Sequence, residues 1–150
     1  MKLELSIQRS VIIVIRVKDI AIIAIFAAFL FIQEQVLSFL PNVQLTVLLI
    51  VVYSRVFGFK KTAIIITIHV LLDNLIMGSF NILVVGFMFS GWMFIPLTLS
   101  TIFSNVKSAL GLAFLGILFA FVYSWFLIIP GMILQELTFL QYLSGDIFFE

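Results

Sequence analysis

Residues 108–135 read SALGLAFLGILFAFVYSWFLIIPGMILQ and contain no charged side chain. An α-helix rises about 1.5 Å per residue, so about 20 apolar residues cross the roughly 30 Å of hydrocarbon in a bilayer. This run is long enough to do so. It therefore predicts a transmembrane helix.

The rest of the chain has the same character. Two further uncharged stretches cover 35–54 and 74–106, and the 150 residues are 64% hydrophobic and 10% charged. A soluble domain of this length needs a mostly polar surface, and the charged residues are too few to form one. Segments such as 20–32 are apolar on every face, whereas the strands of a membrane barrel alternate polar and apolar residues. The sequence therefore predicts an all-α integral membrane protein.

We expect a single transmembrane domain over 1–150 with five transmembrane helices. Residues 1–17 form a cytoplasmic lead-in at the membrane surface. Proline and glycine at Pro41, Gly58, Gly78 and Pro130 separate the helices that follow. The expected helices cover about 19–39, 44–57, 61–77, 81–103 and 107–129.

The segment 132–150 has two interpretations. It is either an external segment that lies along the outer surface, or the start of a sixth helix at which the chain is truncated. We expect truncation, because no basic residue closes the segment.

The basic residues form three groups, which the predicted helices place on one side of the membrane. The groups are Lys2, Arg9, Arg16 and Lys18; Arg55, Lys60 and Lys61; and Lys107. Loops rich in Lys and Arg remain in the cytoplasm. We therefore expect a multi-pass protein with a cytoplasmic N-terminus.

Several function classes lack the residues they need. Cysteine is absent, the net charge is +1, and no basic tract supports nucleic-acid binding. Metal-dependent membrane proteases need several His and carboxylate ligands, and the chain has one histidine. No phosphate-binding loop or nucleophile elbow is present. We expect no enzyme and no cofactor.

Polar side chains within the predicted helices gather toward the external side. Polar groups in a bilayer usually face the bundle interior or a cavity. The candidate substrate-binding residues are Gln33, Glu34, Asn42, Gln44, Asp73, Asn74, Asn81, Trp92, Tyr123 and Trp125. They predict a pocket for a small polar molecule, open to the exterior. The alternative is that residues such as Gln44 only meet lipid headgroups.

Trp92, Trp125 and His69 each have more than one interpretation. Trp92 and Trp125 are either interfacial anchors or the aromatic wall of the pocket, and the depth of Trp92 favours the wall. His69 lies one helical turn before Asp73, on the same face. We expect it to bond Asp73 or to pack against a neighbouring helix. A metal site needs more ligands than this pair.

Short patterns are distributed along most of the chain. They are Lys18-Asp19-Ile20-Ala21, the Ala24-xxx-Ala28 pair, the turn FLPNVQLT at 39–46, Leu72-Asp73-Asn74, and GDIFFE at 145–150. Together they resemble the patterns of the substrate-binding S components of energy-coupling factor (ECF) transporters.

The resemblance implies a substrate-binding subunit for bacterial vitamin uptake, located in the plasma membrane. Such proteins have six helices, bind substrate in the outer half of the membrane, and dock on a transmembrane coupling subunit driven by two ATPases. Ala21, Ala24 and Ala28 would form the docking surface. The missing sixth helix departs from the family. The alternatives are a stand-alone secondary transporter, with Glu34 or Asp73 as its coupling group, and a non-transport membrane assembly protein.

Overall fold

The computed structural model describes residues 16–37, 45–76, 80–136 and 138–149, with side chains as far as 144. All regular structure in these ranges is helical. The helices are α2 (Val17–Leu37), α3 (Thr46–Ile76), α4 (Ile82–Ser100), α5 (Ala109–Gln135) and α6 (Phe139–Phe149). The expected lead-in before residue 16 and the turn around Pro41 lie outside the described residues.

Three of the described helices, α2, α4 and α5, are long and apolar enough to cross a membrane. The all-helical class is thereby confirmed for the described residues, and three of the five helices are candidate membrane spans. The helix α3 carries Arg55, Lys60, Lys61 and Asp73 along its length, and α6 has only 11 residues. The described residues therefore support five helices but not five transmembrane spans.

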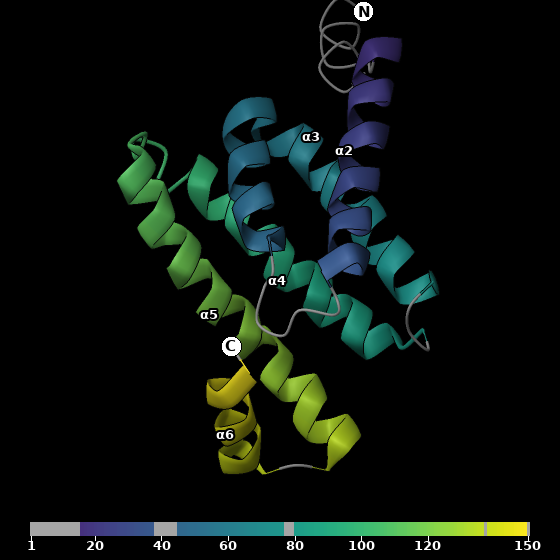
Figure 1. The fold of residues 1–150 in the computed structure, drawn as a ribbon, viewed down its shortest axis with the longest axis vertical. Helices are drawn as coiled ribbons and strands as arrows, with labels where there is room; N and C mark the ends of the chain where they lie inside the picture. Colours follow the sequence, from purple (N-terminus) through teal and green to yellow (C-terminus); the bar gives the residue numbers. More distant parts are fainter. Residues whose placement is uncertain (1–15, 38–44, 77–79, 137, 150) are drawn as a thin grey trace, which may run out of the picture.

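The helix α3 bends sharply at Gly58, where φ is 75° and ψ is 175°. This backbone conformation is open almost only to glycine, since a Cβ atom would clash with the backbone. The two halves, 46–57 and 59–76, run in opposite senses, and Figure 1 shows them as two arms that meet beside the start of α2. The bend coincides with the break that the sequence predicts between its second and third helices.

We expect Gly58→Ala to destabilise the protein by about 1–3 kcal/mol, the usual strain of such a backbone conformation in a non-glycine residue. Apart from the adjoining backbone, no atom lies within 4 Å of a Cβ built at Gly58, so the loss would come from the backbone conformation and not from side-chain packing. The measurement is thermal unfolding in detergent. Gly116→Ala is the control, because that site is equally open and has no positive φ. An unchanged melting temperature for Gly58→Ala would contradict the bend.

The central element is α3, which packs against α2, α4 and α5. Its position follows from the bend, which lets both halves contribute side chains to one core. The most buried large side chains of that core are Leu30, Ile50, Ile65, Ile66, Trp92, Ile95 and Phe119. By contrast, large apolar side chains remain exposed along the outer faces of α2 and α5. Such faces are those that lipid covers in a membrane protein.

The helix α5 does not stop at Pro130, contrary to the sequence-based prediction. It continues through the proline to Gln135 and ends at Glu136, whose φ is 53°. Proline removes one backbone hydrogen bond, but membrane helices tolerate it when neighbouring elements support the backbone. The segment expected to be external from residue 132 therefore begins as the last turn of α5.

Beyond Glu136 the chain folds back, and α6 packs against α5. A Cβ atom at Gly131 would overlap the ring of Tyr142. The glycine thus permits α6 to approach the last turns of α5 closely (Figure 1).

The end of α4 is closed by a side chain from α3. The Arg55 guanidinium donates hydrogen bonds to the carbonyl oxygens of Leu99 (3.3 Å), Phe103 (2.6 Å) and Ser104 (3.4 Å). The last carbonyl groups of a helix have no partner within it, so a cation at this place stabilises the helix end. As a result α4 ends at Ser100, earlier than the expected 103.

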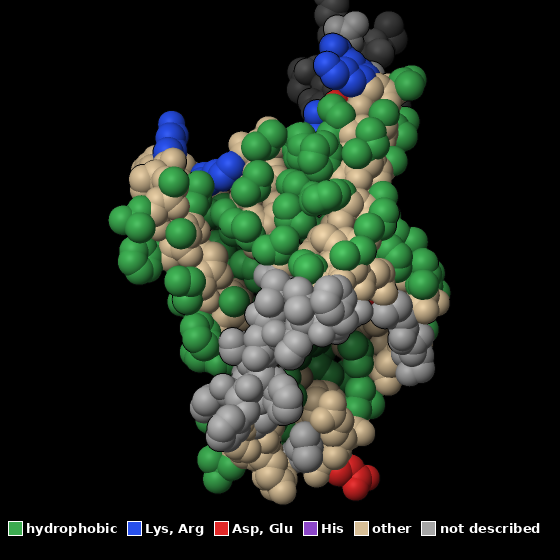
Figure 2. Space-filling view, viewed as in Figure 1, with side chains coloured by type: hydrophobic (Ala, Val, Ile, Leu, Met, Phe, Trp, Pro, Cys, Tyr) green, Lys and Arg blue, Asp and Glu red, His purple; other side chains and the backbone are tan. Residues whose placement is uncertain are grey.

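The described basic side chains lie at one end of the molecule. Figure 2 shows the visible Lys and Arg side chains gathered at the upper end, where α2 and α5 begin, above a surface that is mostly hydrophobic. At this end the Nζ atom of Lys61 lies 2.6 Å from Asp19 Oδ1, which joins α3 to the start of α2. The fold therefore separates a basic end from the end at which α2 finishes.

Candidate functional site

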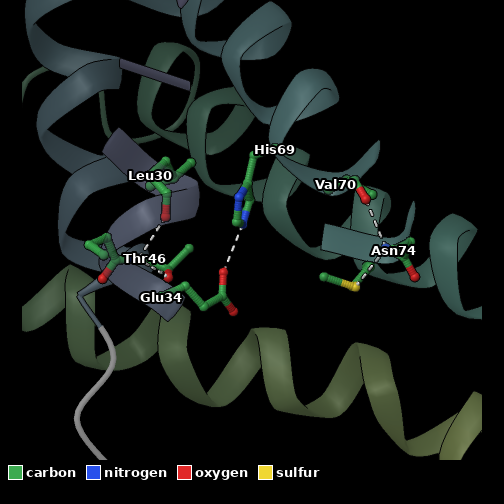
Figure 3. Close-up of polar contacts among 8 residues, drawn as sticks. Leu30, Glu34, Thr46, His69, Val70 and Asn74 are labelled. Carbon is green, nitrogen blue, oxygen red and sulfur yellow. Dashed lines mark hydrogen bonds and ion pairs between the residues drawn. The ribbon is translucent and has the colours of Figure 1, made fainter. Parts of the chain in front are cut away.

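The candidate site lies where the end of α2 meets the start and the second half of α3. Gln33 and Glu34 occupy the last turns of α2, and Thr46 is the first residue of α3. His69 lies in the second half of α3, which the bend at Gly58 returns toward α2. Figure 3 shows the side chains of Glu34, Thr46 and His69 converging from separate helical segments.

Gln33 connects α2 to α3. Its Nε2 atom donates hydrogen bonds to Leu30 O (3.0 Å) and to Thr46 Oγ1 (2.8 Å). The side chain is buried, and its Oε1 atom has no hydrogen-bond partner among the described residues. One polar atom of Gln33 thus holds the two helices together while the other is left unsatisfied, which is unfavourable for a buried group.

Glu34 contacts His69 across the helix pair. The Oε2 atom of Glu34 lies 3.2 Å from His69 Nε2, and the imidazole ring is completely buried (Figure 3). Within the described part of the chain neither ring nitrogen makes a hydrogen bond of good geometry. His69 therefore packs against a neighbouring helix, as one of the two sequence-based alternatives expects.

Asp73 brings a second carboxyl group to the same place. It is half-buried and lies one helical turn beyond His69, the residue that contacts Glu34. The ion pairs of the described residues join Lys61 to Asp19 and His69 to Glu34, so no Lys or Arg among them neutralises Asp73 or Glu34. The site therefore holds two acidic groups in largely apolar surroundings, with His69 beside them and no described Lys or Arg paired with either.

Asn74 of α3 contacts α4, and an aromatic pair joins α4 to α5 one helical turn further along. Asn74 Nδ2 donates to Val70 O at 2.8 Å and contacts Met88 Sδ at 3.4 Å. Trp92 follows Met88 by one helical turn and stacks on Tyr123 of α5, with ring centroids 3.6 Å apart and planes 17° apart. The indole is 1% exposed, and its N–H has no hydrogen-bond partner among the described residues. Trp92 therefore packs in the core between α4 and α5, and whether it lines a pocket stays a prediction.

Other predicted residues do not join this cluster. The Asn81 side chain accepts a hydrogen bond from Leu83 N at 3.0 Å and caps the start of α4, which is a structural role. Trp125 points outward from α5 and is 59% exposed. Asn42 and Gln44 lie outside the described residues.

The predicted docking residues share an exposed face of α2. Ala21, Ala24 and Ala28 are all exposed, whereas the intervening Ala27 is buried against the core. Small side chains on an exposed helical face let a second helix approach closely in a membrane. This face is therefore free to meet a partner.

The cluster combines carboxyl, amide, hydroxyl and imidazole groups. Among the described residues, no three His, Asp or Glu side chains lie close enough together to hold a metal ion. The groups present are hydrogen-bond donors and acceptors, two carboxylates and a stacked aromatic pair. Sequence reasoning missed Thr46, Met88 and the contact between His69 and Glu34, because their partners lie on other helices and no spacing along the chain reports them.

No protein-family model matches this chain, and no curated protein and no solved structure is significantly similar to it.

Proposed function

We propose that this chain is the substrate-binding subunit of an ATP-driven, ECF-type uptake transporter. It would capture a small, vitamin-like molecule from outside the cell and dock on a separate transmembrane coupling subunit with two ATPases. The observation that carries the proposal is the convergence of Gln33, Glu34, His69 and Asp73 within otherwise apolar helices. Polar and ionisable groups are energetically unfavourable inside a membrane, and where they occur they usually mark functional sites.

The direction of capture follows from the distribution of charge. The described basic side chains lie at the end where α2 and α5 begin, which the positive-inside rule assigns to the cytoplasm. Glu34 is near the opposite end of α2, so the cluster would face the exterior. In this arrangement both halves of α3 enter the bilayer and the chain passes through it five times. The first half, 46–57, is about 18 Å long by helical rise, so the helix itself would cover only part of the roughly 30 Å of hydrocarbon.

The energy for uptake must come from partners in this proposal, since the sequence contains no phosphate-binding loop. The exposed alanine face of α2 supports a docked state, because it offers close helix contact without a charged side chain. Ligand capture would therefore occur in this chain, and transport would require the whole assembly in a bacterial plasma membrane.

The docking surface gives the direct test. We expect Ala24→Leu to reduce recovery of the coupling subunit in a pull-down from membranes by about tenfold, which corresponds to about 1.4 kcal/mol of lost docking energy. The leucine would hold the partner helix away from α2. Ala113→Leu on the exposed face of α5 makes the same change elsewhere and should leave recovery unaltered. Recovery that is equal for both variants would contradict docking through this face.

A stand-alone secondary transporter is the second candidate. The uncompensated pair Glu34 and Asp73 favours it, since buried carboxylates couple proton movement in such proteins. Substrate uptake in cells with and without the coupling module separates the two functions. Uptake by the chain alone would support the secondary transporter and overturn our proposal.

A further inference from the structure

The charged side chains of the candidate site indicate which class of ligand could bind there. Glu34 and Asp73 come from different helices, and His69, which contacts Glu34, lies one helical turn before Asp73. No described Lys or Arg pairs with either carboxyl group. The nearest ionisable partner is His69, which touches Glu34 without a hydrogen bond of good geometry. Two like charges in apolar surroundings are strongly unfavourable unless a positive charge or a proton comes between them.

The described basic residues near this fold's core are engaged elsewhere. Arg55 caps the end of α4, and Lys61 is paired with Asp19 at the basic end of the molecule. The segment 38–44, which joins α2 to α3, contains no Lys or Arg in its sequence. The described residues therefore leave the compensation of these charges to a proton or to a positive charge from elsewhere, which a bound cation can supply.

Unsatisfied buried groups beside the carboxylates point to the same conclusion. His69 is completely buried, its ring is directed at Glu34, and neither ring nitrogen makes a hydrogen bond within the described residues. The Oε1 atom of Gln33, in the residue before Glu34, is also buried and unsatisfied. Buried polar groups are nearly always hydrogen-bonded, so such a cluster indicates a site that a polar ligand completes.

We propose that the ligand is an organic cation, with a protonated nitrogen bound between Glu34 and Asp73. This inference rests on the proposed role of the chain as a binding subunit and specifies its substrate class. Both carboxylates would accept hydrogen bonds from the cationic nitrogen, and the unsatisfied Gln33 Oε1 atom offers a further acceptor. Charge-assisted bonds of this kind are about twice as strong as neutral ones. The metal alternative is disfavoured, because no described group of three His, Asp or Glu side chains has the required proximity.

The test uses three probes of similar shape and different charge. Benzylamine is cationic at neutral pH, benzyl alcohol is neutral and benzoate is anionic. Each is titrated into the full chain in detergent and followed by calorimetry. We expect saturable binding of benzylamine, at least about tenfold tighter than that of the other two, because charge-assisted hydrogen bonds are stronger than neutral ones.

Charge-removing variants locate the binding. Glu34→Gln and Asp73→Asn keep the side-chain volume and should each weaken benzylamine binding about tenfold or more. Glu136→Gln removes an exposed acidic charge at the end of α5 and should have no effect. Circular dichroism and size-exclusion profiles that match the unmodified chain show that each variant is folded.

The outcomes separate this inference from the function on which it rests. Preference for benzoate or benzyl alcohol would overturn the cationic ligand while leaving a binding subunit in place. Binding of none of the probes at millimolar concentration would also overturn it. The proposed function has its own readouts, which are docking on the coupling subunit and recovery of a native ligand with the purified protein.

Discussion

Replacing Gly91 by leucine should force α4 away from α5 and lower the melting temperature of the protein strongly. A Cβ atom built at Gly91 would lie 2.8 Å from Tyr123 Cδ2 and 3.3 Å from Phe126 Cβ. Because the Tyr123 ring is stacked on Trp92, it cannot move aside without breaking that contact. Overpacking of a closely packed contact usually costs about 1–3 kcal/mol, and the longer leucine side chain belongs at the upper end of that range.

The matched control lies in the same helix. Gly86 is exposed, and no atom lies within 4 Å of a Cβ built there, so Gly86→Leu should be nearly neutral. Thermal unfolding in detergent, followed by tryptophan fluorescence in a Trp125→Phe background, reports on Trp92 alone. Similar melting temperatures for the two leucine variants would show that α4 and α5 do not approach each other at Gly91.

The helical character of the chain could be predicted because it depends on local composition. Runs such as 108–135 are too long and too apolar for a soluble protein, and three of the described helices match the length that a membrane requires. The helix break at Gly58 could also be predicted, since a glycine beside Lys60 and Lys61 is typical of a turn between helices. The structure places a positive φ at that residue.

Pro130 shows the limit of local signals. A proline followed by glycine normally ends a helix, and the sequence-based prediction ended one there. In the structure the helix continues to Gln135, with Pro130 buried and Gly131 lying under the ring of Tyr142. The glycine serves the close approach of α6, and that contact depends on residues after the helix, which periodicity does not reveal.

The candidate site was predictable in its residue types but not in its partners. Glu34 and Asp73 stood out because carboxylates are rare in apolar helices, and both lie in the cluster. His69 was expected either to bond Asp73, which is adjacent on its own helix, or to pack against another helix. It packs against α2, where it meets Glu34, because the bend in α3 decides which helices face each other. Trp125 was grouped with Trp92, yet helix rotation places one outside and the other in the core.

A ligand that remains bound during purification should be lost when either carboxylate is removed. We expect mass spectrometry of the full chain, purified in detergent, to find one small molecule in near-stoichiometric amount. Its recovery should fall about tenfold or more in Glu34→Ala and in Asp73→Ala, because each substitution removes a charged hydrogen-bond acceptor worth roughly 1.5–3 kcal/mol. Both side chains belong to the same cluster, so their effects should be similar in kind.

The comparison with Glu136→Gln distinguishes a local effect from general loss of acidic charge. Glu136 is exposed at the end of α5, and its replacement should leave recovery of the ligand unchanged. If the two alanine variants fold normally and retain the ligand, the polar cluster is not the binding site. In that case the unsatisfied groups of Gln33 and His69 would serve packing between α2 and α3, and the exposed alanine face would be the remaining support for the proposed function. If the ligand is lost only from these variants, its chemical structure tests the cationic class directly, since a protonated nitrogen must then be present in it.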